Sequence, residues 1–344
     1  MSPSRKRFKN PRAGQHVPGR TCSIAAVGSY LPSRVLTNAE LEKMVDTSDE
    51  WITSRTGIRE RRIAAPDEFT SDLGAKAALQ AMSKASIQGD QIDLIITATI
   101  TPDMPFPSAA CLIQQKIGAT RAAAFDIQAA CSGFIYGLEI GHQFITSRTC
   151  ETVLVIGAEK LSSIIDWKDR NTCVLFGDGA GAAILQTHPS SHGLLTACLG
   201  SDGSRAELLC MPGGGSRHPT TAETVASRLH FLRMDGKETF KSAINAMYSA
   251  SKEALRRCEL DISQIKCIIP HQANRRIIDA VAEKLGARPD QLFTNVERYG
   301  NTSAASVAIA LDEAVTTGRI QGGDLVLLIV FGAGLTWGAV VIEW

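Results

Sequence analysis

The sequence predicts an α/β fold made of two similar halves, and three features support this prediction. From Thr21 onward, short runs rich in β-branched and aliphatic residues alternate with segments of helical periodicity. Two pairs of segments resemble each other at nearly the same separation along the chain. The 344 residues are 44% hydrophobic and 21% charged, which is typical of a soluble globular protein with room for two half-domain cores.

Strands are expected at short apolar runs that are bounded by turn-forming residues. In chain order these runs are Ile24–Ser29, Asp93–Thr99, Ala122–Ile127, Thr152–Gly157, Ala182–Gln186, Gly193–Cys198, Lys266–Ile269, Asp324–Phe331 and Ala339–Ile342. Helices are expected where apolar residues recur every three or four positions. In chain order these segments are Asn38–Val45, Thr70–Lys84, Ser108–Ile117, Gly133–Thr146, Gly236–Arg256, Arg275–Leu285 and Ser303–Thr317.

The internal repeat indicates a gene duplication. ASIQGDQIDLIITATIT and CELDISQIKCIIPHQA each lead from a helix end into a buried strand, and Asp93 there matches Lys266. CSGFIYGLEIGHQFITSRTCETVLVIGAE parallels SAASVAIALDEAVTTGRIQGGDLVLLIVFGAG, and there Cys131 matches Ser303. We therefore expect an N-terminal half at residues 21–190 and a C-terminal half at residues 191–344, with an active site between them.

The first twenty residues form a basic tail that is expected to be disordered. They carry six lysines and arginines and no acidic residue, and without these six charges the formal net charge of +1 becomes −5. The tail lacks the apolar core of a secretory signal. No basic stripe is interleaved with aromatic residues, so no nucleic-acid partner is expected. No apolar run approaches the ~20 residues of a membrane span, so no membrane association is expected.

The nine cysteines indicate a reduced, cytoplasmic protein. They are scattered from Cys22 to Cys267, without a C-x-x-C motif and without the spacing of Cys/His metal ligands. A disulfide framework and a zinc site are therefore not expected. Most of these thiols are expected to be small core residues.

Three polar residues are the candidates for catalysis: Cys131 in AACSGF, His271 in IIPHQANRR and Asn301 in RYGNTSAAS. Each is expected where a strand-like run ends and a helix-like segment begins, so that the side chain lies on a rigid turn. A thiol at a helix start is close to the positive end of the helix dipole, which favours the thiolate. A cysteine, a histidine and an amide together can make an acyl-transfer site that handles carbon nucleophiles.

Each of the three residues also has a purely structural explanation. A buried cysteine is usually inert, a lone histidine is more often structural than catalytic, and Gly-Asn-Thr-Ser is good capping chemistry for Asn301. The other six histidines fall in loops, on helix faces or in the tail and are assigned no role. The joint occurrence of the three residues favours the catalytic interpretation.

Two glycine-rich runs have different interpretations. VLFGDGAGAAIL has G-x-G-x-G spacing and leads into a strand, so close backbone packing is favoured over dinucleotide binding. VFGAGLTWGAVV places Gly332–Ala333–Gly334 after an apolar strand. Such a turn can offer a backbone N–H to an oxyanion.

Six motifs together resemble the β-ketoacyl-acyl-carrier-protein synthase III family of the thiolase superfamily. They are TNAELEKMVDTSDEWITSRTGIRERRI, AACSGF, FGDGAGAA, PHQANRRI, GNTSAASVAIALDEA and FGAGLTWG, and the resemblance covers Thr21 to Trp344. It implies a five-layered αβαβα fold of two duplicated halves, usually as a homodimer. The implied reaction is a decarboxylating Claisen condensation of an acyl-CoA starter with malonyl-acyl-carrier protein, which initiates fatty acid synthesis. Acyl-CoA is then a substrate, and no cofactor or metal is implied.

The resemblance also implies roles for single residues. Cys131 would accept the acyl group, while His271 and Asn301 would stabilise the enolate oxygen as malonate loses carbon dioxide. The N–H groups of Cys131 and Ala333 would form the oxyanion hole. Residues along the path of CoA and pantetheine would be Thr47, Trp51, Arg55, Arg170, Gly236 and Asn274, of which Trp51 and Arg170 would flank the adenine.

Three further residues complete the implied site. Arg276, together with Arg275, would receive the acidic carrier protein. Phe106 would lie at the end of the acyl pocket, which favours a short starter such as acetyl. Leu335, where many family members have an aromatic residue, and the long segment Cys210–Phe231 favour the opposite, because both could reshape the acyl tunnel.

Related enzymes differ at identifiable positions. Thiolases need a second cysteine in the C-terminal glycine turn, and VFGAGLTW has none. Elongating synthases have a second histidine where this chain has Asn301. Condensing enzymes of secondary metabolism share the Cys-His-Asn set, so an enzyme of that type with a longer or unusual starter is the main alternative. A non-catalytic partner subunit is disfavoured, since it would normally have lost Cys131.

Overall fold

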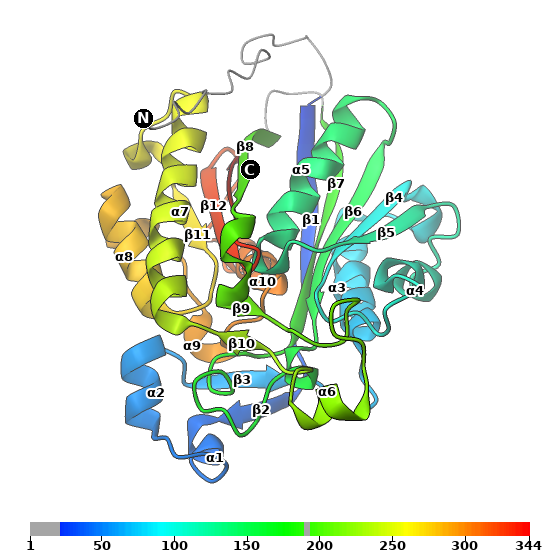
Figure 1. Ribbon diagram of the computed structural model, residues 1–344. Coiled ribbons are helices and arrows are strands. Elements are labelled where there is room, and N and C mark those ends of the chain that lie inside the picture. The colour runs from blue at the N-terminus through cyan, green and yellow to red at the C-terminus, as the bar shows by residue number, and fades with distance from the viewer. Residues whose placement is uncertain (1–20, 189–192) are drawn as a thin grey trace, which may run out of the picture.

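The computed structural model describes residues 21–188 and 193–344. Its helices and sheets form five alternating layers, αβαβα, as the family resemblance implied (Figure 1). The basic tail expected at residues 1–20 lies outside the described residues. Residues 189–192, at the expected boundary between the halves, also lie outside them.

Two mixed sheets form the inner framework, and each takes its strands from one side of residues 189–192. The first has the order β1-β7-β6-β4-β5, with β4 parallel to β5 and β6, and β7 antiparallel to β1 and β6. Its strands are β1 (Thr21–Tyr30), β4 (Leu94–Ala98), β5 (Ala123–Ile127), β6 (Thr152–Glu159) and β7 (Gly179–His188).

The second sheet has the order β11-β12-β13-β8, with β11 parallel to β12 and the other pairs antiparallel. Its strands are β8 (Gly193–Ser201), β11 (Cys267–Pro270), β12 (Leu325–Gly332) and β13 (Thr336–Glu343). All nine predicted strands are present, with ends that differ from the prediction by a few residues.

Helices fill the centre and cover both outer faces. α5 (Gly133–Thr146) and α10 (Ala305–Thr316) lie between the sheets and contact strands of both. The outer face of the first sheet is covered by α3 (Thr70–Ala85) and α4 (Ala109–Lys116), and that of the second by α7 (Gly236–Arg257) and α8 (Arg275–Leu285) (Figure 1). The main apolar core surrounds α5 and α10 and takes residues from both sheets.

Three glycines on one face of α5 let this helix pack closely on side chains of the first sheet. A Cβ atom added at Gly133, Gly137 or Gly141 would lie 2.7 Å from a side-chain atom of Ala98, Val155 or Leu185, respectively. These three partners belong to strands of the first sheet. The helix that follows Cys131 therefore packs directly against that sheet.

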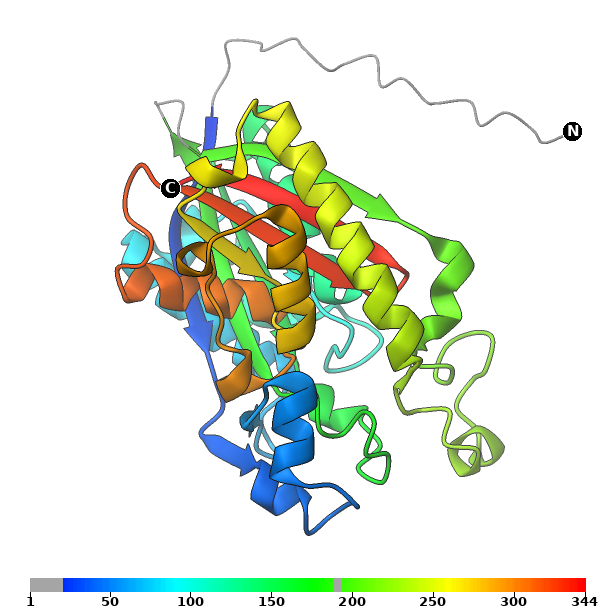
Figure 2. The ribbon, with the colours of Figure 1, turned by 90° about the vertical axis from the view of Figure 1, so that its left-hand side faces the viewer.

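Several short elements were not predicted because they are too short or too polar for a periodic signal. They are β2 (Arg34–Thr37), β3 (Glu60–Ile63), β9 (Leu209–Cys210), β10 (Arg233–Met234), α2 (Asp49–Thr56), α6 (Ala222–Ala226), α9 (Val296–Tyr299) and six 3-10 turns at Gly89–Gln91, Ala130–Ser132, Leu161–Ser163, Gly203–Leu208, Ile262–Gln264 and Pro289–Gln291. α1 (Asn38–Leu41) is shorter than predicted. α2 lies below α8 (Figure 2), and its two ends are held by the Ser48 cap and by Gly57 at φ +78°.

Candidate active site

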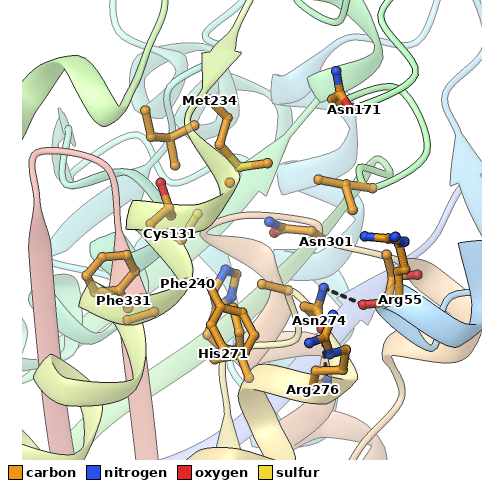
Figure 3. Close-up of a pocket in the computed structure, with 18 of the residues that line it drawn as sticks. Arg55, Cys131, Asn171, Met234, Phe240, His271, Asn274, Arg276, Asn301 and Phe331 are labelled. Carbon is orange, nitrogen blue, oxygen red and sulfur yellow. Dashed lines mark hydrogen bonds between the residues drawn. The ribbon is translucent and has the colours of Figure 1, made fainter.

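Two cavities meet at Cys131. The larger cavity has a volume of 750 Å³ and is lined by Cys131, His271 and Asn301 together with residues of α2, α7 and α8. The smaller cavity has a volume of 330 Å³ and is lined mainly by apolar residues. Cys131 belongs to both linings, so its sulfur lies at their junction. Figure 3 shows the three candidate side chains around the larger cavity.

The backbone around Cys131 is closely packed. Cys131 lies in a 3-10 turn between β5 and α5, after Ala130 at φ +46°. A Cβ atom added at Gly332 would lie 2.7 Å from the backbone nitrogen of Cys131, so only glycine lets the end of β12 approach this closely. Ala333 follows and lines the smaller cavity. The Oγ1 of Thr336 lies between the carbonyl oxygens of Ala129 and Ala333, at 2.9 and 3.0 Å, and its single proton can be donated to one of them at a time.

The thiol environment differs from the prediction. Cys131 is only 6% exposed, and burial, with a smaller contribution from the Glu159 charge, raises the pKa of its thiol to about 12. A hydrogen bond with Ser303 lowers the pKa but does not offset the burial. The prediction that the helix start makes the thiolate favourable is therefore wrong, because loss of hydration is the larger effect. Because the thiol is protonated at neutral pH, Cys131 needs a group that accepts its proton before it can act as a nucleophile.

His271 is held as a neutral imidazole. It follows β11 directly, and its backbone N–H donates to the carbonyl oxygen of Ile329 at 2.7 Å. Its Nδ1 lies 2.6 Å from the Oγ of Ser306, and burial lowers the pKa of the ring to about 3. α8 begins at Arg275, as predicted, so His271 lies four residues before the helix and is not part of its first turn. The turn of residues 271–274 places the ring in the cavity instead.

Asn301 lies in the turn between α9 and α10. Its predicted place after a strand is wrong, because the short helix α9 precedes it. Its Oδ1 accepts from the backbone N–H of Ser303 at 2.8 Å, and α10 begins at Ala305 with Ala304 at the cap position. Asn301 therefore does not cap α10, but its side chain stabilises the turn before that helix, as the structural explanation allows. Within the described residues, no acceptor takes a hydrogen bond from the Nδ2 of Asn301, which belongs to the lining of the larger cavity.

The residues assigned to the CoA path divide into two groups. Trp51, Arg55, Gly236 and Asn274 line the larger cavity, whereas Thr47 and Arg170 do not. The guanidinium carbon of Arg170 nevertheless lies 4.8 Å from the ring centre of Trp51. Asn274 also caps α8, and its Nδ2 donates to the carbonyl oxygen of Arg55 at 3.1 Å. The Oγ1 of Thr47 is buried without a hydrogen-bond partner.

Two residues assigned to the acyl pocket lie elsewhere. Phe106 is 84% exposed and lines neither cavity, because the loop before α4 directs it outward. Leu335 is 2% exposed and packs in the core beside Phe331 and Trp337, away from the smaller cavity. The segment after β9 does reach that cavity, through Cys210 and Met211.

The two arginines assigned to carrier-protein docking differ in their contacts. Arg275 pairs with Asp279 at 2.7 Å and packs on Gly57. Arg276 lines the larger cavity, with its guanidinium carbon 5.5 Å from the ring centre of Phe240. The cavity lining also contains Arg55, Lys237 and Lys241 against a single acidic residue, Asp169. Its electrostatic character therefore suits an anionic ligand.

Sequence reasoning missed three residues that touch this machinery. Ser306 orients His271, and Ser303 bridges Cys131 to Glu159, a carboxylate with 0% exposure at the end of β6. One signal was present: an acidic residue closes the otherwise apolar strand TVLVIGAE. Apolar strands rarely end in a fully buried acid unless it has a role or a set of donors.

The described residues contain neither a metal site nor a membrane-spanning helix. Among the described residues, no group of three or more His, Cys, Asp or Glu side chains is placed to hold a metal ion. None of the helices in residues 21–188 and 193–344 is long and apolar enough to cross a bilayer.

Known proteins resemble this chain over most of its length. The family model described as 3-Oxoacyl-acyl-carrier-protein (ACP) synthase III matches residues 125–203, and the one described as its C terminal matches residues 255–344. A relative from Caldanaerobacter subterraneus subsp. tengcongensis, named beta-ketoacyl-acyl-carrier-protein synthase III, is 56% identical over 321 residues, covering 93% of this chain and 97% of the relative.

Solved structures agree with this result. The crystal structure of 3-oxoacyl-acyl-carrier-protein synthase III from Aquifex aeolicus VF5 is 47% identical, with a TM-score of 0.88 over 95% of this chain and 100% of that chain. The priming β-ketosynthase from the R1128 polyketide biosynthetic pathway is 36% identical, with a TM-score of 0.88 over 96% of this chain and 98% of that chain.

Proposed function

Since the chain belongs to the β-ketoacyl-acyl-carrier-protein synthase III family, we propose that it joins a short acyl-CoA starter, such as acetyl-CoA, to malonyl-acyl-carrier protein. It is an acyl-transferring condensing enzyme of the type that initiates fatty acid synthesis. The products are 3-oxoacyl-acyl-carrier protein, CoA and carbon dioxide. The secondary-metabolic alternative is not favoured, because relatives at 50–56% identity bear the synthase III name while the polyketide priming enzyme is 36% identical.

One observation carries the assignment of roles: Cys131 lies where a large, cation-lined cavity meets a small apolar one. The large cavity suits the phosphates and pantetheine arm of CoA or of the carrier protein. The small cavity suits the acyl chain. A thiol at their junction is the natural acceptor for an acyl group carried on pantetheine.

Acylation of Cys131 is the first half-reaction. Its thiolate attacks the thioester carbonyl carbon, and the carbonyl oxygen gains negative charge. We assign the stabilisation of this oxyanion to the N–H groups of Cys131 and Ala333. The close approach of Gly332 to the nitrogen of Cys131 supports this role, since it brings the turn that carries Ala333 beside the nucleophile. CoA then leaves as a thiolate.

Decarboxylation of malonyl is the second half-reaction. It needs donors for the enolate oxygen and no base that would protonate the carbanion. His271 stays neutral, and when its Nδ1 accepts from the hydroxyl of Ser306, its Nε2–H is free to donate to the enolate. The Nδ2 of Asn301 supplies a second donor, because its Oδ1 is held by Ser303. Both donors are uncharged and fixed before the reaction.

The adenine of CoA is proposed to bind at Trp51. At 4.8 Å from the ring centre, the Arg170 guanidinium leaves no room for a base between the two side chains. Binding therefore requires Arg170 to swing away from Trp51 and to close again over the base. Arg55, at 5.1 Å from the same ring centre, contributes positive charge for the phosphates.

Intact-protein mass spectrometry after incubation with a panel of acyl-CoAs tests the proposed function. A mass increase equal to the acyl group is expected for short starters. Later addition of malonyl-acyl-carrier protein should remove the adduct and yield the 3-oxoacyl product. An enzyme that forms no adduct with any member of the panel would contradict the assignment.

Reversing the charge at Arg276 should weaken carrier-protein binding. Arg276→Glu is expected to raise KM for malonyl-acyl-carrier protein and to reduce the salt dependence of kcat/KM, because an acidic partner is steered to this cation. Kinetics toward acyl-CoA should change much less. Arg276 is the better candidate because Arg275 already pairs with Asp279.

Lys266→Glu is the matched control for this experiment. Lys266 is exposed and precedes β11, so it lies at the opposite end of the strand from His271. Its reversal makes the same change in net charge far from the cavity and should leave both kinetics unchanged. If the two charge reversals had equal effects, the carrier protein would not dock at α8.

The starter preference should depend on Phe106. The cavity of 330 Å³ has more room than acetyl needs, since about 150 Å³ already holds benzene. A short-chain preference therefore requires a second copy of the chain to bring its exposed Phe106 to the cavity. Along acetyl-, butyryl- and octanoyl-CoA, kcat/KM is expected to fall, and each methylene denied burial costs roughly 0.8 kcal/mol, about fourfold.

Phe106→Ala is expected to flatten this series. Phe69→Ala, which removes another exposed phenylalanine that does not line the cavity, is the matched control and should leave the series unchanged. A preference for octanoyl-CoA in the unchanged protein would contradict the short starter and strengthen the secondary-metabolic alternative.

Three broader proposals complete this function. A homodimer is supported by the exposed apolar side chains of Phe106 and Met104, and analytical ultracentrifugation tests it. The organisation into halves at residues 21–190 and 191–344 is supported by the two sheets, each built from one half. Cytoplasmic location is supported by nine unpaired cysteines. The proposed reaction uses no cofactor or metal.

A further inference from the structure

Glu159 is a buried carboxylate without a positive partner in the described part of the chain. It has 0% exposure, and each of its hydrogen-bond partners donates to it. These partners are the Oγ1 of Thr101 at 2.6 Å, the backbone N–H of Ile100 at 3.2 Å, the Oγ of Ser303 at 3.1 Å and the Oγ1 of Thr99 at 3.3 Å. A lone buried charge of this kind is costly and calls for an explanation.

Ser303 connects this carboxylate to the nucleophile. Its hydroxyl donates to Glu159 at 3.1 Å, Ser303 and Cys131 line the same smaller cavity, and the neighbouring Ser303 hydroxyl lowers the pKa of the Cys131 thiol. Ser303 is fixed at φ +47°, and its backbone N–H donates to the Oδ1 of Asn301 at 2.8 Å. A hydroxyl has a single proton, so while Ser303 donates to Glu159 it can only accept from the S–H of Cys131. The three groups form a continuous Cys131–Ser303–Glu159 chain.

We propose that Glu159 accepts the thiol proton of Cys131 through Ser303 and stores it while the sulfur carries the acyl group. The S–H bond breaks as an O–H bond forms on Ser303, and the original hydroxyl proton of Ser303 passes to the carboxylate. The single negative charge moves from Glu159 to the sulfur. Ser303 then donates to the thiolate. Glu159 acts on Cys131 only through Ser303, and its role is to hold the transferred proton.

The charge balance of the site supports this relay. Ionising Cys131 while Glu159 stays ionised would bury two negative charges together, and the Glu159 charge does raise the pKa of Cys131. Transfer along the chain keeps one buried charge throughout. Burial raises the pKa of Glu159 to about 7, which suits a group that exchanges a proton near neutral pH.

The relay also fits the whole catalytic cycle. The thiolate attacks the acyl-CoA, and the charge leaves with the CoA thiolate, which takes a proton from water. Glu159 keeps its proton beside the neutral thioester. When the condensation expels Cys131 as a thiolate, that proton returns through Ser303 and restores the starting state. This inference rests on the proposed role of Cys131 as acyl acceptor.

Other titratable groups near the relay are neutral or engaged elsewhere. On the elements packed around it these are His271, Asp103, Asp126, Glu139, His142, Lys160, Asp178, Asp312 and Glu313. Burial lowers the pKa of His271 and of His142, which favours their neutral forms, and Lys160 donates to carbonyl oxygens of residues 65–68. Among the acids, Asp103, Asp126 and Asp178 accept from backbone N–H or serine groups, whereas Asp312 and Glu313 pair with Lys84 and Arg298.

The test is the pH dependence of iodoacetamide alkylation at Cys131, followed by mass spectrometry of the Cys131 peptide. This readout needs no acyl-CoA, so it is independent of whether the proposed condensation occurs. A coupled pair loses its protons in two macroscopic steps. The unchanged protein should therefore show a first rise in rate near neutral pH and a second at alkaline pH. Absence of the first rise would overturn the relay.

Two variants break the relay at different points. Glu159→Gln removes the acceptor, and Ser303→Ala removes the bridge; alanine is compatible with the backbone there, since Ala130 adopts a similar φ of +46° in the turn before α5. Both should lose the first rise, because burial contributes more than the Glu159 charge to the raised thiol pKa. In both variants the alkylation rate should instead rise continuously with pH, without the plateau that a coupled pair gives between its two steps.

Asp178→Asn is the matched control. It neutralises another fully buried carboxylate that accepts from Ser162 and the N–H of Ala64 and does not contact Cys131. Its profile should keep both rises. His271→Gln should also keep them; loss of the first rise there, with retention in Glu159→Gln, would assign the proton to His271 and overturn the proposal. A uniform decrease at all pH values in both relay variants would indicate a structural role only.

Discussion

Replacing Cys131 with alanine should abolish acyl transfer from acyl-CoA and leave no covalent adduct detectable by intact-protein mass. The reason is chemical: among the residues that the structure describes, Cys131 is the only nucleophile that lines both the cation-lined cavity and the apolar one. Far-UV circular dichroism and thermal unfolding should stay close to those of the unchanged protein, because the substitution removes one sulfur atom from the wall of a cavity.

Cys210→Ala is the matched control for this prediction. Cys210 lines the same apolar cavity, is partly exposed and belongs to β9. Its replacement should leave acylation intact. If Cys131→Ala still becomes acylated, at Cys210 or at another cysteine, the nucleophile has been wrongly assigned.

Removing either donor to the enolate should cripple malonyl decarboxylation. His271→Ala and Asn301→Ala are each expected to slow this half-reaction by on the order of 10²-fold or more, the scale of losing an oxyanion donor. Stopped-flow or radiometric measurement of carbon dioxide release from malonyl-acyl-carrier protein gives this rate. Acylation of Cys131 should suffer less in Asn301→Ala, since the asparagine donates to the enolate and not to the thiol.

Asn171→Ala tests whether any amide of this cavity has the same effect. Asn171 lines the larger cavity, and its Nδ2 donates to Asp169 at 3.1 Å, so it is already engaged. Its replacement should leave decarboxylation within a few-fold of the unchanged enzyme. Equal loss of both half-reactions in Asn301→Ala would contradict the division of roles proposed for the three residues.

The rate of decarboxylation should not change through protonation of His271 as the pH falls from neutral to mildly acidic values. Burial lowers the pKa of His271 to about 3, so the ring carries no charge through neutral and mildly acidic pH. Its role as a neutral donor is therefore not lost as pH falls through the ordinary histidine range. An acid limb in that range that disappears in His271→Ala would show that the imidazole titrates in the working enzyme.

Much of the fold could be predicted from local patterns. Periodicity located all nine main strands and gave α5 and α8 their observed bounds, because long apolar segments carry strong periodic signals. Polar or very short elements escaped, as in α2, which is stabilised by its Ser48 cap and its contact with α8. Such elements depend on tertiary contacts more than on propensity.

The sequence by itself determined the alternation of strands and helices and the choice of Cys131, His271 and Asn301 as candidates, because alternating apolar runs and short motifs carry these signals, while the layer order followed from the family resemblance. Only the tertiary structure decided how these residues are held. The outward position of Phe106, the burial of the thiol and the bond between Ser303 and Glu159, which are 144 positions apart, all arise from packing between distant segments. Burial and hydration set the charge of each group, and neither can be read from the order of residues along the chain.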